Sequence, residues 1–117
     1  MGLSDTMLEA LHRCRYQAPT PIQAAFIPEA LDGLDVIGQA KTGTGKTAAF
    51  GIPLIEMLES RARGPQAIVL APTRELTQQI VAEVQRLAMG SSVAVCGIFG
   101  GEPIDRQIHA LDRKSVV

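Results

Sequence analysis

One short run of residues constrains the fold of this chain more than any other: Ala40-Lys41-Thr42-Gly43-Thr44-Gly45-Lys46-Thr47. Residues 35–39 before it predict a short buried strand, and the apolar residues after it predict a helix. A glycine-rich turn between a strand and a helix that opens on Lys-Thr is typical of a phosphate-binding loop. Such a loop surrounds an anion with backbone N–H groups, including those of the first helical turn.

Individual residues of this phosphate loop have distinct expected roles. Gly43 and Gly45 lack a Cβ atom, so the backbone can turn its N–H groups towards a phosphate. Lys46 is expected to reach the outer phosphates, and the hydroxyl of Thr47 is expected to bind Mg²⁺. The first glycine of the general pattern is Ala40 here. A glycine-rich turn alone is common without a ligand, but the complete run in this context favours nucleotide binding.

Length and composition limit the chain to one domain or a piece of one, because it has 117 residues. Hydrophobic residues make up 46% of the chain and aromatic residues only 3%, with no Trp, so a packed aliphatic core is expected. The formal net charge is −1, so any contact with nucleic acid must be local rather than made by a basic face.

Cysteine and histidine residues do not point to a metal centre. Cys14 and Cys96 stand far apart, which favours reduced thiols over a disulfide framework, and His12 and His109 are isolated. No apolar run is long enough to span a membrane, and no signal peptide opens the chain. We therefore expect a soluble, cytoplasmic protein with no membrane partner.

Helix and strand signals alternate along the chain. Helices are expected over 5–15, 21–32, 46–58, 74–89 and 103–111, and strands over 35–39, 67–71, 93–98 and 115–117. This alternation favours an α/β fold, with a parallel sheet and helices on both faces. Ligands of such sheets bind beyond the carboxyl ends of the strands. The loops expected there are the phosphate loop, residues 72–76 and Gly100-Gly101.

With residues 16–23, these loops form four ordered motifs, and the chain resembles the amino-terminal part of a DEAD-box ATP-dependent RNA helicase over essentially its whole length. The resemblance implies a partial RecA-like P-loop domain: an incomplete helicase ATP-binding domain over residues 1–117, with the second RecA-like domain absent. It also implies ATP and Mg²⁺ as cofactors. In this family alanine is normal at the position of Ala40. All eight residues of the phosphate loop then bind the nucleotide, and Lys46 and Thr47 act in catalysis.

Tyr16 and the run Pro19-Thr20-Pro21-Ile22-Gln23 resemble the Q motif of the family. The resemblance implies that Gln23 recognises the adenine edge and that Tyr16 stacks near the base, with Pro19 in the same site. A carboxamide offers a donor and an acceptor, which match those of adenine. Thr20-x-x-Gln23 is also a capping box, which needs no nucleotide, and both roles can coexist through different atoms. Arg15 stands where the family commonly has glycine.

The two later motifs are expected to contact RNA. Residues 72–76 resemble motif Ia, and Gly100-Gly101 resembles a glycine doublet beside the RNA path. A helix amino terminus with a cationic fork is a good phosphate receptor. The alternative is a helix cap, a solvated arginine and an ordinary turn. The resemblance implies backbone contacts with single-stranded RNA, independent of base sequence, by Pro72, Thr73, Arg74, Glu75, Gly100 and Gly101.

The sequence contains no Asp-Glu-Ala-Asp run and no apolar strand ending in acidic residues. In the family this segment supplies an Mg²⁺-binding Asp and the Glu that positions the attacking water. We therefore expect the chain alone neither to hydrolyse ATP nor to unwind RNA at a meaningful rate. In the family's sheet the strand of this segment lies beside that of the phosphate loop. Its loss predicts an exposed apolar edge, weak stability and self-association of the truncated sheet.

The predicted function is therefore that of a DEAD-box ATP-dependent RNA helicase fragment. It carries the Q motif, phosphate loop and motif Ia of a longer protein that binds ATP and RNA and continues beyond Val117. The alternative is a non-catalytic nucleotide- or RNA-binding remnant that acts by association with other chains. A P-loop helicase acting on DNA is disfavoured by the Q-motif pattern.

Overall fold

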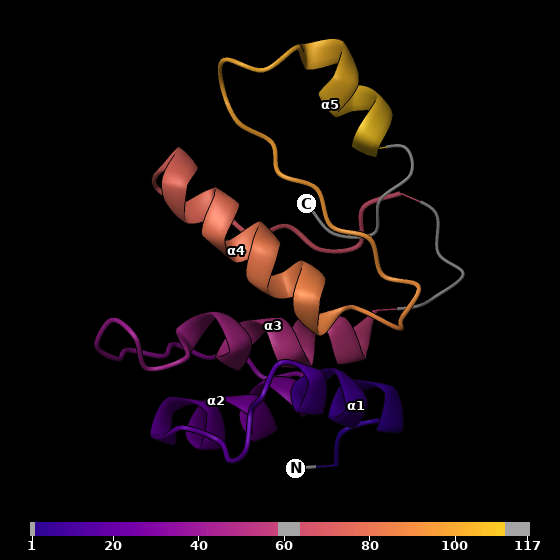
Figure 1. The fold of residues 1–117 in the computed structure, drawn as a ribbon. Coiled ribbons are helices and arrows are strands. Elements are labelled where there is room, and N and C mark those ends of the chain that lie inside the picture. The colour runs from indigo at the N-terminus through magenta and orange to yellow at the C-terminus, as the bar shows by residue number, and fades with distance from the viewer. Residues whose placement is uncertain (1, 59–63, 112–117) are drawn as a thin grey trace.

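The computed structural model of the chain describes residues 2–58 and 64–111, which contain five helices (Figure 1). Each of the five helices expected from the sequence is confirmed, with small differences at the ends. The first helix ends early because Arg15 has a φ of +63°, a left-handed conformation that a helix does not continue through. The helices are α1 (Asp5–Arg13), α2 (Pro21–Leu31), α3 (Lys46–Met57), α4 (Arg74–Leu87) and α5 (Ile104–Leu111).

Polar side chains begin α1 and α4, as the sequence indicates. The Met7 N–H donates to Ser4 Oγ at 3.2 Å, and the Leu76 N–H donates to Thr73 Oγ1 at 3.1 Å. Both bonds satisfy N–H groups that have no partner within the helix. The Ser4 N–H and hydroxyl also donate to the two carboxylate oxygens of Glu56, each at 2.8 Å. The start of α1 is therefore fixed to α3.

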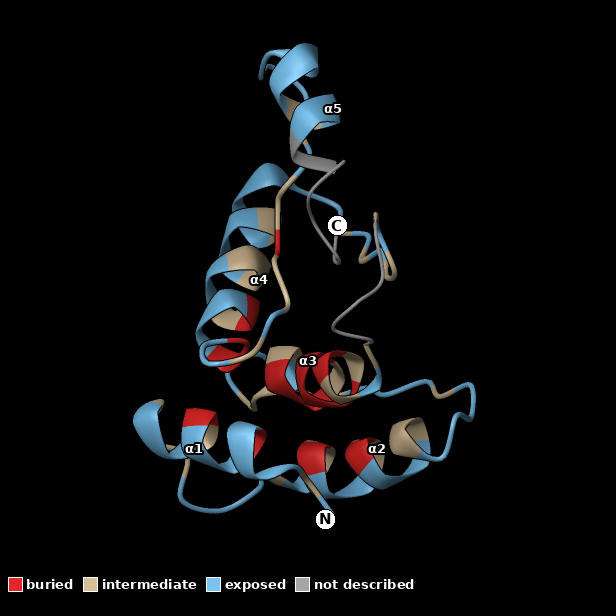
Figure 2. Cartoon of the chain, turned by 90° about the vertical axis from the view of Figure 1, so that its right-hand side faces the viewer, coloured by how far each residue is buried: buried red, intermediate tan, exposed pale blue. Residues whose placement is uncertain are grey.

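Helix α3 lies at the centre of the helical assembly. Both α2 and α4 pack against it, and α1 contacts α4. Figure 2 shows α1 and α2 on one side of α3, with α4 rising from the other. Among the described residues the buried cluster is aliphatic, as the low aromatic content predicts. Its members are Met7, Ile27, Ala48, Ile52, Ile55, Val84, Leu87, Ala88 and Val95.

The expected parallel sheet is not formed within the described residues, which contain no strand. Residues 35–39, 67–71 and 93–98 are non-helical segments, with single β-bridges at Ala67 and Val95. A segment becomes a strand only when a neighbour pairs with its N–H and C=O groups. The expected strand over 115–117 lies outside the described residues.

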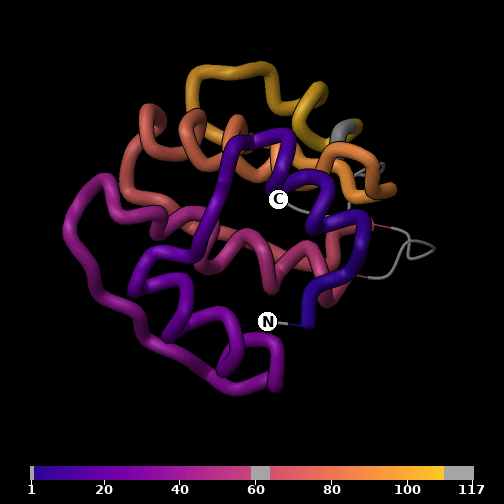
Figure 3. Tube along the Cα trace, turned by 60° about the horizontal axis from the view of Figure 1, so that its bottom comes forward, coloured from indigo at the N-terminus to yellow at the C-terminus, as the bar shows by residue number. Residues whose placement is uncertain are grey.

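Apolar side chains that a sheet would cover are accessible to solvent. Ile37 is 100% exposed and Leu70 is 90% exposed. In Figure 3 the trace between α2 and α3 forms a wide loop at the edge of the molecule. Residues 68–71 and 95–98, in contrast, lie against α4, and together they line a cavity of about 470 Å³. Residues 35–39 are therefore largely exposed and residues 95–98 lie against α4, whereas residues 68–71 contact α4 on one side and leave Ile68 and Leu70 exposed on the other.

None of the described helices combines the length and the apolar character that crossing a membrane requires.

Candidate nucleotide-binding site

The turn of the phosphate loop enters α3 at Gly45, which is the N-cap of this helix and has a φ of +83°. Gly43 also has a positive φ, of +81°. Both values lie in the left-handed region that glycine adopts without steric cost. The Thr44 hydroxyl donates to the Lys41 carbonyl at 2.5 Å. This hydrogen bond closes the turn over residues 41–44. The local sequence thus produces the tight turn that it predicts.

Lys46 and Thr47 are the first two residues of α3. Among the described residues no side chain caps this helix, so its first N–H groups keep their capacity to bind an anion. The Lys46 side chain is exposed and makes no hydrogen bond or ion pair within residues 2–58 and 64–111, so its ammonium group is available to a ligand. Free N–H groups, a lysine and an adjacent hydroxyl form a donor set that fits a polyphosphate with Mg²⁺.

Gln23 connects the start of α2 to the phosphate loop. Its side chain is 2% exposed. The Thr20 N–H donates to Gln23 Oε1 at 3.1 Å, which is the capping contact that the sequence offered as an alternative. Gln23 Nε2 donates to the Gly45 carbonyl, also at 3.1 Å. A Cβ atom at Gly45 would overlap the Gln23 carboxamide, so this approach requires glycine.

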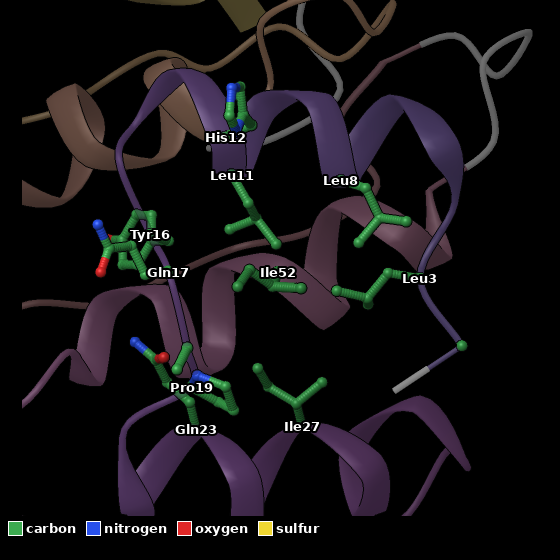
Figure 4. Close-up of a pocket in the computed structure, with 12 residues that line it drawn as sticks. Leu3, Leu8, Leu11, His12, Tyr16, Gln17, Pro19, Gln23, Ile27 and Ile52 are labelled. Carbon is green, nitrogen blue, oxygen red and sulfur yellow. The ribbon is translucent and has the colours of Figure 1, made fainter.

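One buried atom and one cavity near Gln23 bear on a ligand. Thr20 Oγ1 is buried and has no hydrogen-bond partner among residues 2–58 and 64–111, which leaves a polar atom unsatisfied beside Gly45. Gln23 and Pro19 line one edge of a cavity of about 630 Å³ between α1, α2 and α3 (Figure 4). The opposite walls of this cavity are apolar and include Leu8 and Leu11.

Tyr16 is held by a contact that the sequence did not predict. Its hydroxyl donates to a carboxylate oxygen of Glu83 on α4, and Glu83 also pairs with Arg86 at 2.6 Å. The ring is half-buried and packs against the aliphatic core. Burial, together with the Glu83 carboxylate that accepts a hydrogen bond from the phenol, raises the pKa of Tyr16 above its usual range. Tyr16 therefore joins the Q-motif segment to α4.

The raised pKa leads to a titration that reports on Tyr16 alone, because Tyr16 is the only Tyr and there is no Trp. A phenol whose pKa is raised on folding adds stability below the unfolded pKa of about 10, and this stability is lost as pH rises through the folded pKa. We expect tyrosinate absorbance to appear at higher pH in the folded chain than in urea. Glu83→Gln should lower the folded midpoint, whereas Glu29→Gln should not. Equal midpoints in folded and unfolded chains would contradict the contact.

The predicted RNA-binding residues lie at the start of α4 and in the turn before α5. Thr73 Oγ1 caps α4, so the alternative helix-cap role is present. Pro72, Glu75 and Gly100 are exposed. Arg74 is not simply solvated, because its guanidinium donates to the Gly100 carbonyl. The structure thus brings together two motifs that the sequence placed 26 residues apart.

Three residues that contact the motif segments were missed by sequence reasoning: Glu83, Phe99 and Gln107. Glu83 binds Tyr16, the Phe99 ring lies beside the Arg74 guanidinium, and Gln107 binds the backbone of residues 99 and 102. Glu83 is one of several polar residues on an amphipathic helix, and nothing in the pattern distinguishes it. Phe99 offered a weak signal, since it precedes the glycine doublet directly. Tertiary contacts alone identify these residues.

Comparison with known proteins places the geometry in context. The family model described as DEAD/DEAH box helicase matches residues 20–117. The DEAD-box ATP-dependent RNA helicase CshA of Bacillus cereus is 47% identical over 113 residues, which are 97% of this chain and 22% of CshA. The chain therefore spans less than a quarter of that relative's length.

Two solved structures share the fold. A DEAD box protein from the hyperthermophile Methanococcus jannaschii matches with a TM-score of 0.95 and 40% identity, over 100% of this chain and 32% of that protein. The RNA helicase Prp28 from Chaetomium thermophilum, bound to ADP, matches with a TM-score of 0.80 and 44% identity, over 99% of this chain and 30% of Prp28. The path of the backbone is thus that of a DEAD-box protein.

Proposed function

The chain belongs to the DEAD/DEAH box helicase family, and from this premise we propose that it is the nucleotide-binding part of an ATP-dependent RNA helicase. The observation that carries the proposal is the hydrogen bond from Gln23 Nε2 to the Gly45 carbonyl at 3.1 Å. It joins the segment expected to recognise adenine to the loop expected to hold the phosphates. One ATP molecule can therefore contact both, and the ADP bound to the related Prp28 supports this reading.

The phosphate groups would be held by the loop over residues 40–47. The backbone N–H groups of this loop and of the first turn of α3 bind the anion, and Lys46 neutralises the outer phosphates. The described residues contain no group of three His, Cys, Asp or Glu that could hold a metal ion. Mg²⁺ would bind the Thr47 hydroxyl together with phosphate oxygens, which are the hard oxygen ligands that this ion prefers. When bound, the ion shields the charge of the triphosphate.

The RNA backbone would lie across the start of α4 and the Gly100-Gly101 turn. Residues 72–75 are exposed at the amino end of α4, where the helix dipole favours a phosphate. Gly100 has open space in the direction of a Cβ atom, so a sugar–phosphate strand can approach the backbone there. Contacts of this kind do not depend on base sequence.

The non-helical segments would act as strands of a RecA-like domain. Residues 35–39, 67–71 and 93–98 have the apolar pattern of strands, and the TM-score of 0.95 to a DEAD box protein supports this. Their N–H and C=O groups need neighbouring strands before a parallel sheet forms. We infer that residues 1–117 form an incomplete helicase ATP-binding domain.

The proposal is tested by titration of the 117-residue chain with MgATP, with phosphate release followed on the same samples. We expect saturable binding of MgATP without steady turnover. The positioning groups of an acidic motif are absent from the sequence, and phosphoryl transfer depends on such positioning. Steady phosphate release that Lys46→Ala abolishes would contradict the inferred inactivity. Absence of any MgATP binding would contradict the proposed site.

A second candidate function is a non-catalytic module that acts by association, and the exposure of Ile37 and Leu70 favours it. Exposed apolar segments with unpaired backbone groups promote association between copies of a chain. Light scattering on the titrated samples separates the candidates. A species larger than one chain favours association, whereas a monomer with a sharp thermal transition argues against it.

A further inference from the structure

The turn over residues 99–102 connects the segment 93–98 to α5, and two helices reach it with polar side chains. Arg74, the first residue of α4, approaches one side of the turn. Gln107 of α5 approaches its backbone from another direction. A turn held by contacts of this kind keeps one backbone geometry, whereas a free Gly-Gly turn samples many.

Arg74 makes two contacts with the turn. Its guanidinium donates to the Gly100 carbonyl, and its Cζ atom lies 5.2 Å from the centre of the Phe99 ring. This distance is within the range in which a guanidinium is attracted to an aromatic face. The Arg74 guanidinium is therefore held by the Phe99 ring while it binds the carbonyl of Gly100, the residue after Phe99. Within residues 2–58 and 64–111, Arg74 forms no ion pair with a carboxylate.

Gln107 makes two further contacts. The Phe99 N–H donates to Gln107 Oε1 at 2.9 Å, and Gln107 Nε2 donates to the Glu102 carbonyl at 3.3 Å. The carboxamide therefore spans the turn, from the residue before the glycine doublet to the residue after it. Both its donor and its acceptor function are used on the backbone.

The two glycines differ in what surrounds them. Gly101 has a φ of +87°, which strains any residue with a side chain, and a Cβ atom there would lie 2.6 Å from Arg74 Nη2, so a larger residue would displace the guanidinium. A Cβ atom at Gly100 would meet no atom of the described residues within 4 Å. Gly101 thus faces the arginine, and Gly100 faces open space.

We propose that Arg74 is a positioning residue that acts with Phe99 and Gln107 to hold the Gly100-Gly101 turn in the geometry that receives an RNA phosphate. The proposal rests on the proposed RNA-binding function and deepens it. The phosphate contact is then made by the backbone at Gly100 and by the amino end of α4. The charge of Arg74 contributes through the position of the turn rather than as a direct phosphate contact.

The contacts of Arg74, Phe99 and Gln107 with the turn are called the clamp below. Hydrogen exchange of the backbone amides at residues 99–102, measured without RNA, tests the clamp directly. Phe99→Leu removes the aromatic face without a change in charge, and Arg74→Lys keeps the charge without the planar fork. Both variants are expected to exchange roughly threefold to tenfold faster at these amides, as expected for the loss of a modest contact. Gly101→Ala should do the same, and Arg106→Lys, at an exposed arginine of α5, is the matched control that should leave exchange unchanged.

Binding of single-stranded oligouridylate over a range of salt concentrations, with Mg²⁺ and a non-hydrolysable ATP analogue, tests the role towards RNA. Phe99→Leu and Arg74→Lys should each weaken binding roughly threefold to tenfold. The slope of log affinity against log salt should stay unchanged. If Arg74 contacts a phosphate directly, Arg74→Gln should instead make this negative slope shallower by about 0.7, because one counterion fewer is released.

The outcomes separate this proposal from the proposed function. Normal exchange in Phe99→Leu and Arg74→Lys overturns the clamp, whether or not RNA binds. Wild-type affinity in Arg74→Lys with a lower slope in Arg74→Gln overturns the positioning role in favour of a direct contact. Absence of RNA binding by the unchanged chain overturns the proposed RNA function and the purpose assigned to the turn. The exchange rates would still report whether Arg74 holds the turn.

Discussion

A chain with Lys46 replaced by alanine is expected to bind MgATP roughly 30-fold to 150-fold more weakly, since a hydrogen bond to a charged group contributes about 2–3 kcal/mol. Lys46 begins α3 beside the free N–H groups of its first turn, where a phosphate is attracted most strongly. Its ammonium group has no hydrogen bond or ion pair among the described residues. The substitution therefore removes a ligand contact and leaves the fold intact.

Isothermal titration calorimetry measures the affinity, and thermal unfolding checks the fold. Arg106→Ala is the control for loss of a cation, because Arg106 is exposed on α5 and is not part of the phosphate loop. It should bind MgATP as the unchanged chain does. Equal affinity in Lys46→Ala would mean that the nucleotide does not occupy this loop. A large drop in unfolding temperature would mean that Lys46 has a structural role.

Gln23→Ala is expected to lower the free energy of unfolding by about 2–4 kcal/mol, because each buried group left without a partner costs about 1–3 kcal/mol. The side chain is 2% exposed. The variant leaves the Thr20 N–H and the Gly45 carbonyl without these partners. For a domain of this size the unfolding temperature should fall by roughly 8–16 °C. Because Gly45 is no longer held, affinity for the triphosphate should fall as well.

Thermal unfolding followed by circular dichroism measures the first effect. Gln17→Ala is the matched control, because Gln17 lines the same cavity but is exposed. An unfolding temperature within a few degrees of Gln17→Ala would show that the two hydrogen bonds of Gln23 contribute little to the fold.

Titration with ATP and GTP separates the two roles of Gln23. Adenine recognition predicts that Gln23→Ala loses more affinity for ATP than for GTP, because only the adenine edge matches the carboxamide. Equal losses for both nucleotides would mean that Gln23 acts through the helix start and the phosphate loop alone. The hydrogen bonds to Thr20 and Gly45 make a loss for GTP an expected part of the result.

Much of the helical framework could be predicted because its signals are local. Ser4 and Thr73 each cap a helix three residues before the N–H that they bind, and Gly45 supplies the positive φ at the start of α3. The left-handed Arg15 was not expected to end α1, since non-glycine residues rarely adopt that conformation. The two caps and the glycine turn could be predicted because they depend on residues no more than a few positions apart.

The expected sheet could not be predicted from the apolar segments alone, because each strand also needs a neighbouring strand to pair with. Residues 35–39 have the apolar pattern of a buried strand, yet Ile37 is fully exposed. A pattern predicts which residues favour burial, but a strand also needs hydrogen-bond partners from other segments. Residues 68–71 and 95–98 show the partial outcome, because α4 packs against them without a paired ladder.

The amino-acid pattern was sufficient for the helices, the turn of the phosphate loop and the four ordered motifs, because each depends on residues a few positions apart. The partners of the motif side chains required the folded chain. Gln23 binds Gly45 over 22 residues, Arg74 binds Gly100 over 26, and Tyr16 binds Glu83 over 67. Local preferences carry no information about which distant donor and acceptor meet; the packing of α2 and α4 around α3 determines that.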